Sequence, residues 1–252
     1  MNPPSSLLVH GQNDAQSRLK LYGRRKGRPL SAEMQSALDS GLEQFGIDRT
    51  IIHGVPAHSI AAKDFFPSTV HRPPLTGYWL EIGFGGGDFI AAQSALNPDI
   101  GLIGCEAYEN GIAKTAQKLL AQKSDNVRIY PDDARHLLPK LQNASLDAIF
   151  LLFPDPWPKA RHAKRRFVNP DNLAQLARVI EPGGKFWVAS DHDVYRAWVV
   201  EQMMDPAQIW FKPEHPGDIF ASPPPAGWVT TGYQRKAIRA GRDSKFACFS
   251  KI

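Results

Sequence analysis

The sequence of 252 residues predicts an α/β domain built on a mostly parallel, doubly wound β-sheet. One observation is that short apolar runs alternate with helix-like segments of about ten residues, which is typical of β-α-β units. Another is the run 149–153, Ile-Phe-Leu-Leu-Phe, which is apolar throughout, as expected of a strand buried on both faces. Apolar residues make up 42% of the chain, enough for a large core. We expect the C-terminal strand to be antiparallel.

Apolar runs, and the Ser, Pro and Gly residues at their ends, define the expected strands and helices. The expected strands are residues 78–82, 100–106, 127–130, 149–153, 185–190, 208–212 and 246–250. The expected helices are residues 88–96, 111–123, 170–180 and 194–204, with a short one ending near Leu141. Pro170 suits a first helical turn, and Glu181-Pro-Gly-Gly stops that helix. Ser31 caps a short helix whose apolar side is Leu30, Met34, Leu38 and Leu42.

The chain divides into two parts. Residues 1–54 are expected to form a basic arm and a short helix, partly disordered, because residues 1–17 show no hydrophobic periodicity. Residues 55–252 are expected to form the α/β domain, entered through a connecting segment at 55–77. The stretch 18–28 is basic and contains Tyr22 and two glycines. It is typical either of an arm that orders on nucleic acid or of a solubilising tail.

The net charge of +5 is unevenly distributed. Residues 1–30 contain six Lys or Arg and one acid, residues 156–166 contain five and none, and residues 232–252 contain six and one. The rest of the chain is therefore strongly acidic. An acidic body with three basic patches is expected of a surface that binds a polyanion around a pocket of opposite charge.

Membrane and secreted classes do not fit this sequence. No apolar run approaches the roughly 20 residues that a membrane span requires, and residues 1–30 lack the apolar core of a secretory signal. Cys105 and Cys248 lie in apolar, strand-like runs without metal-ligand spacing. We therefore expect buried thiols, a reducing compartment, a cytoplasmic protein and no metal.

Acidic residues follow four successive predicted strands. Glu81 and Glu106 end the first two, and Asp133 and Asp155 follow the third and fourth. Ligands of an open parallel sheet bind beyond the carboxyl ends of its strands. Chance explains one or two acids there, but four in equivalent positions predict a common binding cleft.

The loop Gly83-Phe-Gly-Gly-Gly-Asp88 lets the backbone approach a ligand closely. A dinucleotide fingerprint would place a third glycine where Asp88 stands, and a ring of acids would repel a pyrophosphate. S-adenosylmethionine fits better, because it has a sulfonium, an ammonium and ribose hydroxyls. We assign Glu106 to the ribose, as the acid after a second strand usually serves. We assign Asp133 to the adenine amine, and the loop to the methionine part.

The segment Pro154-Asp-Pro-Trp-Pro158 is a stiff loop directly after the fourth strand. Its three prolines hold Asp155 and Trp157 in an extended backbone. Five cations follow between residues 159 and 166. A rigid acid and an aromatic beside cations suit a base held in a pocket while its phosphates are bound outside. The alternative is a turn followed by a solvated charged helix.

With these motifs, the chain closely resembles the tRNA (guanine-N7)-methyltransferase family in its single-chain bacterial form, from about Tyr78 onward. The matching segments are Leu80-Glu-Ile-Gly-Phe-Gly-Gly-Gly-Asp88, Gly104-Cys-Glu106, Asp133-Ala134, Phe153-Pro-Asp-Pro-Trp-Pro-Lys159, Arg161-His162, Lys164-Arg-Arg166, Asp191 and Thr231-Gly-Tyr-Gln234. The resemblance implies a Rossmann-like class I S-adenosylmethionine-dependent methyltransferase fold over residues 55–252. It also implies methyl transfer to N7 of a variable-loop guanosine of tRNA.

The resemblance also implies roles for single residues. It implies contacts with the methyl donor at Glu81, Glu106, Asp133 and Asp155, to which we add Gly83, Gly85 and Gly87 of the loop. It implies tRNA contacts at Lys159, Asp191, Thr231, Gly232, Tyr233 and Gln234. The family usually has Glu where this chain has Gln234, so a carboxylate is missing there.

Guanine N7 has an exposed lone pair and no proton, so its attack on a sulfonium methyl needs no general base, and catalysis should be mostly positioning. Asp155 is the expected catalytic residue, holding the donor edge of the guanine or orienting the methionine ammonium. Trp157 either stacks on the base or supports the loop, and Asp191 either holds the target or caps the helix at Val194. Phosphate contacts are expected at Arg24, Arg25, Lys164, Arg165, Arg166, Arg235 and Lys236.

We expect no obligatory protein partner, and three alternatives stay open. The first is a methyltransferase for another nucleic acid or for protein nitrogen, because an acid-Pro-aromatic segment after the fourth strand also occurs there. The second is a nicotinamide-dependent oxidoreductase, which Asp88 and the acidic ring disfavour. The third is an RNA-binding protein without catalysis, which the intact set of four acids disfavours.

Overall fold

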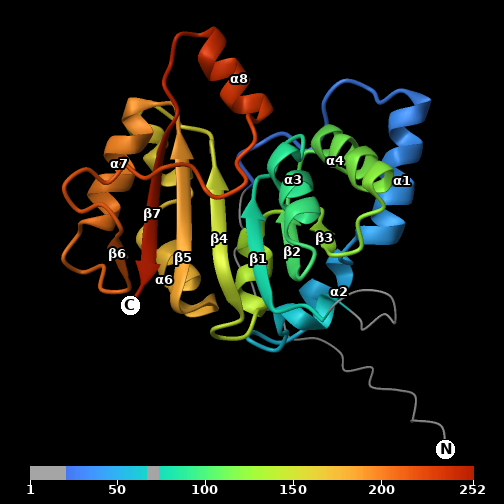
Figure 1. Ribbon diagram of the computed structural model, residues 1–252, viewed down its shortest axis with the longest axis horizontal. Helices are drawn as coiled ribbons and strands as arrows, with labels where there is room; N and C mark the ends of the chain where they lie inside the picture. The colour runs from blue at the N-terminus through green and yellow to red at the C-terminus, as the bar shows by residue number, and fades with distance from the viewer. Residues whose placement is uncertain (1–20, 67–73) are drawn as a thin grey trace, which may run out of the picture.

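The computed structural model describes residues 21–66 and 74–252 and shows one seven-stranded sheet with helices on both faces (Figure 1). The strand order is β3-β2-β1-β4-β5-β7-β6. The strands are β1 (Gly77–Ile82), β2 (Ile100–Cys105), β3 (Val127–Tyr130), β4 (Leu146–Leu152), β5 (Ile180–Ser190), β6 (Phe211–Pro213) and β7 (Lys245–Lys251). The first five strands are parallel, whereas β7 pairs antiparallel with β5 and β6. The predicted fold class, including the antiparallel C-terminal strand, is confirmed.

Two layers of helices cover the sheet. The α-helices are α1 (Ala32–Phe45), α2 (Arg49–Gly54), α3 (Asp88–Leu96), α4 (Glu109–Gln122), α5 (Ala134–Leu137), α6 (Pro170–Val179), α7 (Asp193–Met203) and α8 (Gly232–Arg239). Short 3-10 helices are η1 (Ala62–Phe65), η2 (Leu138–Lys140) and η3 (Ala160–Arg165). One core cluster joins α1, α3 and α4 to β2 and β3, and a larger one joins α5, α6 and α7 to the other side of the sheet. Burial on both faces explains why the central strands are almost wholly apolar.

Most predicted elements lie where the sequence places them. The amide of Met34 donates to the hydroxyl of Ser31, so Ser31 caps α1 as expected. Helix α1 packs along α4, and the backbone after it pairs with β3 at Ile129. Both cysteines are free and buried. The division of the chain at residue 54 stays a prediction, and the expected disorder of residues 1–17 lies outside the described residues.

Three details differ from the prediction. Strand β5 begins at Ile180 rather than at residue 185, because Ile180 pairs with Leu146 before a register shift between Leu146 and Ala148 of β4. The predicted strand at 208–212 is β6, at residues 211–213. The Gln208 side chain accepts hydrogen bonds from the amides of Trp210 and Phe211, which turns this segment away from the sheet. Helices α2 and α8 were not predicted.

The carboxyl ends of the parallel strands form the functional edge of the molecule. Helix α8 lies above this edge, and residues 21–31, the described part of the N-terminal arm, run across it (Figure 1). None of the helices in the described ranges combines the length and apolar character that crossing a bilayer requires. Two basic segments of the sequence therefore lie at the edge where the sheet's ligands are expected.

Candidate active site

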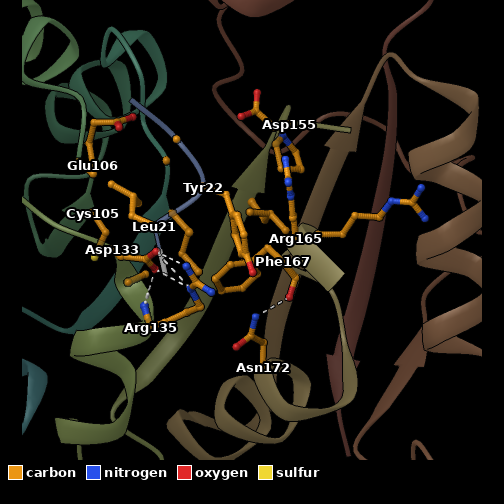
Figure 2. Close-up of a pocket in the computed structure, with 18 of the residues that line it drawn as sticks. Leu21, Tyr22, Cys105, Glu106, Asp133, Arg135, Asp155, Arg165, Phe167 and Asn172 are labelled. Atoms are coloured by element: carbon orange, nitrogen blue, oxygen red, sulfur yellow. Dashed lines mark hydrogen bonds and ion pairs between the residues drawn. The ribbon is translucent and has the colours of Figure 1, made fainter. Parts of the chain in front are cut away.

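A pocket of about 210 Å³ opens at the carboxyl edge of β1, β2, β3 and β4. Its lining includes Gly83, Glu106, Asp132, Asp133, Asp155 and Trp157. Because these four strands are neighbours in the sheet, the acids that follow them lie around one space. Figure 2 shows Glu106 and Asp133 on one wall and Asp155 at the rim. Of the four acids that the sequence predicted to share a cleft, Glu106, Asp133 and Asp155 line this pocket, whereas Glu81 is not part of its lining.

Glu81 lies at the end of β1 and is 6% exposed. Its Oε2 is buried and has no hydrogen-bond partner in the described part of the chain. Burial, followed by the nearby charge of Glu106, raises the pKa of Glu81 to about 8. The carboxyl group of Glu81 therefore has an acceptor oxygen without a partner in the described residues. A cation bound beside it would favour the ionised form.

Glu106 is held in one orientation by backbone amides. Its Oε2 accepts a hydrogen bond from the amide of Gly85 at 2.9 Å, and its Oε1 accepts one from the amide of Tyr108 at 2.9 Å. Burial raises the pKa of Glu106, and these amide hydrogen bonds oppose that effect. The acid after β2 is therefore fixed beside the glycine loop, as a ligand-orienting carboxylate should be.

The glycines of the loop are required by its geometry. Gly83, Gly85 and Gly87 have φ values of +73°, +56° and +69°, a region that other residues rarely adopt. A Cβ at Gly85 would lie 2.5 Å from the ring of Tyr233. A Cβ at Gly83 would meet no atom of residues 21–66 or 74–252 within 4 Å, so this part of the structure leaves the backbone open to a ligand. The loop therefore presents backbone to the pocket at Gly83 and packs against the C-terminal segment at Gly85.

Asp132 and Asp133 have different partners although they are adjacent. Asp133 caps α5 by accepting from the amide of Arg135, and its carboxylate pairs with the Arg135 guanidinium at 2.6 Å. Asp132 is 4% exposed and pairs with Arg25 of the arm at 2.5 Å. The sequence assigned a role to Asp133 alone and missed Asp132. A basic arm and an unassigned acid at the same sheet edge were the available signal.

The loop that bears Asp155 is braced by Arg166. Phe153 and Trp157 have φ values of +54° and +43°, which is unfavourable backbone for aromatic residues. The prediction of an extended backbone at Trp157 and of a strand through Phe153 is therefore wrong. The guanidinium of Arg166 donates to the carbonyl oxygens of Pro156 at 3.2 Å and Trp157 at 3.0 Å. Arg166 is 6% exposed and stacks on Trp198. This burial does not fit the phosphate contact that the sequence predicted for Arg166, because its hydrogen bonds hold the loop instead.

The N-terminal arm covers part of the pocket. Figure 2 shows Tyr22 in the middle of the lining, between Asp133 and Arg135 on one side and Arg165 on the other. The Arg165 guanidinium lies over the rings of Tyr22 and Trp157, at 5.2 and 4.7 Å from their centroids. Trp157 is half-buried, and its ring contacts Tyr22 of the arm and Arg165. Its ring therefore does not lie in the hydrophobic core as a support for the loop.

The other predicted contact residues lie around this pocket. Lys159, which precedes η3, and Lys164, which lies within it, are both exposed. Asp191 follows β5 and pairs with Arg242 at 2.8 Å. The alternative in which Asp191 caps α7 is wrong, because the N-cap residue is His192, which makes no side-chain cap hydrogen bond.

The Thr231 segment is the start of α8 and docks onto the glycine loop. Thr231 caps the helix by accepting from the amide of Gln234. The amide of Gly232 donates to Asp88, and Tyr233 packs on Gly85. The Gln234 side-chain oxygen accepts from Trp228 Nε1 at 2.9 Å, an acceptor role that a carboxylate could also fill. Arg24 of the arm is exposed, and so are Arg235 and Lys236 of α8.

A second hollow of about 340 Å³ lies between α4 and α8 on the outer side of the glycine loop. Its lining contains Lys114, Lys118, Arg235 and Lys236. Lys118 and Arg235 both pair with Asp88, which lies in the first turn of α3. Cationic surface therefore continues from α8 to α4, beyond the patches seen in the sequence.

Comparison with known proteins gives consistent matches. A family model described as "Putative methyltransferase" matches residues 76–247. A tRNA (guanine-N(7)-)-methyltransferase of Granulibacter bethesdensis is 42% identical over 88% of this chain and 91% of its own length. Proteins with the same name are 40% identical in Paramagnetospirillum magneticum, over 95% of both chains, and 37% identical in Rhodospirillum rubrum, over 92% of this chain and 88% of that one.

Proposed function

Because the chain belongs to the tRNA (guanine-N(7)-)-methyltransferase family, we propose that it methylates N7 of a guanosine in the variable loop of tRNA, with S-adenosylmethionine as methyl donor. The observation that supports this most directly is the cleft at one sheet edge that Glu106, Asp133 and Asp155 line, with the buried Glu81 close by near the end of β1. The arm, η3 and α8, which carry exposed cations, lie at the same edge. A positively charged small ligand and a polyanion thus each meet surface of opposite charge.

The residues of the cleft fit S-adenosylmethionine. The unpartnered Oε2 of Glu81 is suited to a cationic centre, and the oriented Glu106 is suited to hydroxyl groups. The open backbone at Gly83 leaves room for the methionine part. Both carboxylate oxygens of Asp133 accept from Arg135, so contact with the adenine amine would require part of this ion pair to give way. When bound, the cofactor supplies an electrophilic methyl group on a sulfonium.

The protein's part in the reaction is to position the guanine. The N7 lone pair needs no proton removed before transfer, so no side chain must act as general base. Asp155 lies exposed at the rim, where its carboxylate can accept from the N1–H and 2-amino group of a guanine. The brace from Arg166 to the carbonyls of Pro156 and Trp157 fixes the loop that carries Asp155. Catalysis is then orientation together with charge placement.

The exposed basic residues bind the RNA backbone. Lys159, Lys164 and Lys236 lie outside the cleft, where phosphates of a folded tRNA can reach them, whereas the half-buried Arg165 lines the cleft itself. Binding through phosphates releases counterions, so added salt should weaken tRNA binding steeply and leave donor binding nearly unchanged. We place the protein in the cytoplasm, without an obligatory protein partner.

The test is incubation with labelled S-adenosylmethionine and bulk tRNA, followed by nucleoside analysis and mapping of the modified position. Label in N7-methylguanosine of the variable loop is the expected result, and label in another nucleoside would contradict the proposal. Asp155→Asn should lower the rate strongly and leave the shape of the pH–rate profile unchanged, because Asp155 positions the base. Loss of the basic limb would instead mean proton removal. Asp171→Asn, an exposed change at the start of α6, is the matched control.

A further inference from the structure

Two imidazoles and a carboxylate meet where α2 lies against α5. His53 comes from the last turn of α2, His136 from α5, and Asp132 from the loop after β3. The possible ligand atoms of the three residues all lie within 4.8 Å of one another. The ring centroids of the two histidines are 5.2 Å apart, and Nδ1 of His136 is 3.7 Å from Oδ2 of Asp132.

The facing atoms of this cluster are available for a ligand. Nδ1 of His136 is buried and has no hydrogen-bond partner among residues 21–66 and 74–252. Its distance from Asp132 is too long for a hydrogen bond, and a buried polar atom without a partner costs free energy. Asp132 directs its Oδ1 to the Asp133 amide and to Arg25, which leaves its Oδ2 facing His136.

We propose that His53, Asp132 and His136 bind one transition-metal ion, with Zn²⁺ the best match. Two imidazole nitrogens and one carboxylate oxygen are the donors that zinc prefers, and three protein ligands leave a fourth position for water. This site could not be recognised from residue spacing, because its ligands come from separate elements of the fold. The expectation of no metal was based on the two cysteines alone.

Small side-chain movements complete the geometry. Zinc lies at about 2.0–2.1 Å from nitrogen and oxygen ligands, so the donor atoms must come closer than they now lie. His53 is exposed and can turn toward the other two residues. Arg25 occupies the opposite oxygen of Asp132, so the ion and the arm can share this carboxylate. A bound ion would fasten α2 to the wall of the pocket that Asp132 lines.

The test uses the full chain, stripped with a chelator and then titrated with Zn²⁺ against a chromophoric competitor. We expect one Zn²⁺ per chain, and binding at least about tenfold weaker in His53→Ala and in His136→Ala. His53 is on the surface, so its replacement leaves the fold intact. His215→Ala, which removes an exposed imidazole after β6, should bind Zn²⁺ like the wild type.

Co²⁺ gives a second readout, because its visible absorption bands report the ligands around the ion. Bands typical of low-coordinate Co²⁺ should appear with the wild-type chain and disappear with His53→Ala. Absence of saturable Zn²⁺ binding, or wild-type affinity in His53→Ala, would overturn the proposal. Neither readout depends on methyl transfer, so the outcome is independent of the function proposed above.

Discussion

The carboxylate of Asp88, in the first turn of α3, accepts a hydrogen bond at 2.7 Å from the backbone amide of Gly232, in the first turn of α8. Arg235 pairs with the same oxygen, and Lys118 pairs with the other. Burial opposes ionisation of Asp88, but these contacts outweigh it, and the pKa of Asp88 is lowered. One acid thus joins the glycine loop to the C-terminal segment that we propose contacts tRNA.

Asp88→Asn should impair the use of tRNA without changing the binding of the methyl donor. The amide oxygen can still accept from Gly232, but the ion pairs with Lys118 and Arg235 are lost. We expect kcat/KM for tRNA to fall about tenfold, equivalent to roughly 1.4 kcal/mol, the scale of one hydrogen bond to a charged group. Calorimetry should show an unchanged affinity for S-adenosylmethionine. Asp193→Asn, which removes a surface ion pair with Arg196, is the control, and equal kinetics in both variants would refute the link.

Glu81 should make folding stability depend on pH. Its pKa of about 8 in the folded chain exceeds the ordinary value of 4.5, so the folded state holds a proton that the unfolded state has released between these values. Stability should therefore fall as pH rises through this window, by up to roughly 1.4 kcal/mol per pH unit. Glu81→Gln should lack this contribution. Urea unfolding of both proteins at pH 6 and pH 8 without methyl donor measures it, and parallel pH profiles would disprove it.

Lys164 and Arg166 should behave differently although both belong to the basic run. Lys164 is exposed, so Lys164→Ala should leave the melting temperature unchanged and reduce the salt dependence of tRNA binding by about 0.7–0.9 in slope. Arg166→Ala should lower the melting temperature and the rate, because the carbonyls of Pro156 and Trp157 lose their donor. Its salt slope should match that of the wild type. Filter binding at several salt concentrations distinguishes the two variants.

The start of the arm should loosen when Arg25 is replaced. Arg25→Ala removes the ion pair with Asp132, and at the pocket wall Tyr22 then keeps only its ring contacts with Arg165 and Trp157. Chymotrypsin should cut after Tyr22 several-fold faster than in the wild type. Arg24→Ala, at an exposed neighbouring position, should leave the cleavage rate unchanged. If both variants are cut at the same rate, the ion pair does not hold the arm.

The sequence predicted the sheet and its acidic edge well because both depend on strong local patterns. Apolar runs mark buried strands, and acids directly after such runs fall at one edge in any parallel sheet. Helix α8 escaped prediction because it is almost wholly polar and buries only Ala237. Its position depends on Asp88, a contact between distant parts of the chain.

Arg166 shows the limit of reading charge from sequence. Nothing in a run of five cations indicates which one turns inward, because that depends on Trp198 and on the path of the loop. The same holds for Asp132. It contacts Arg25, which is distant in the sequence, and faces His136 only because α5 begins directly after it. Residue type and spacing located the site, but the assignment of individual side chains required their tertiary neighbours.

The antiparallel strand β7 lies between β5 and β6, and β6 has no other neighbour in the sheet. In a nascent chain, β6 therefore cannot pair with its neighbour in the sheet until residues 245–251 have left the ribosome. During translation the flank of β5 stays exposed as an unpaired edge, and such edges recruit other chains. Chaperone dependence of this protein should accordingly concentrate on the interval between the emergence of β5 and that of β7.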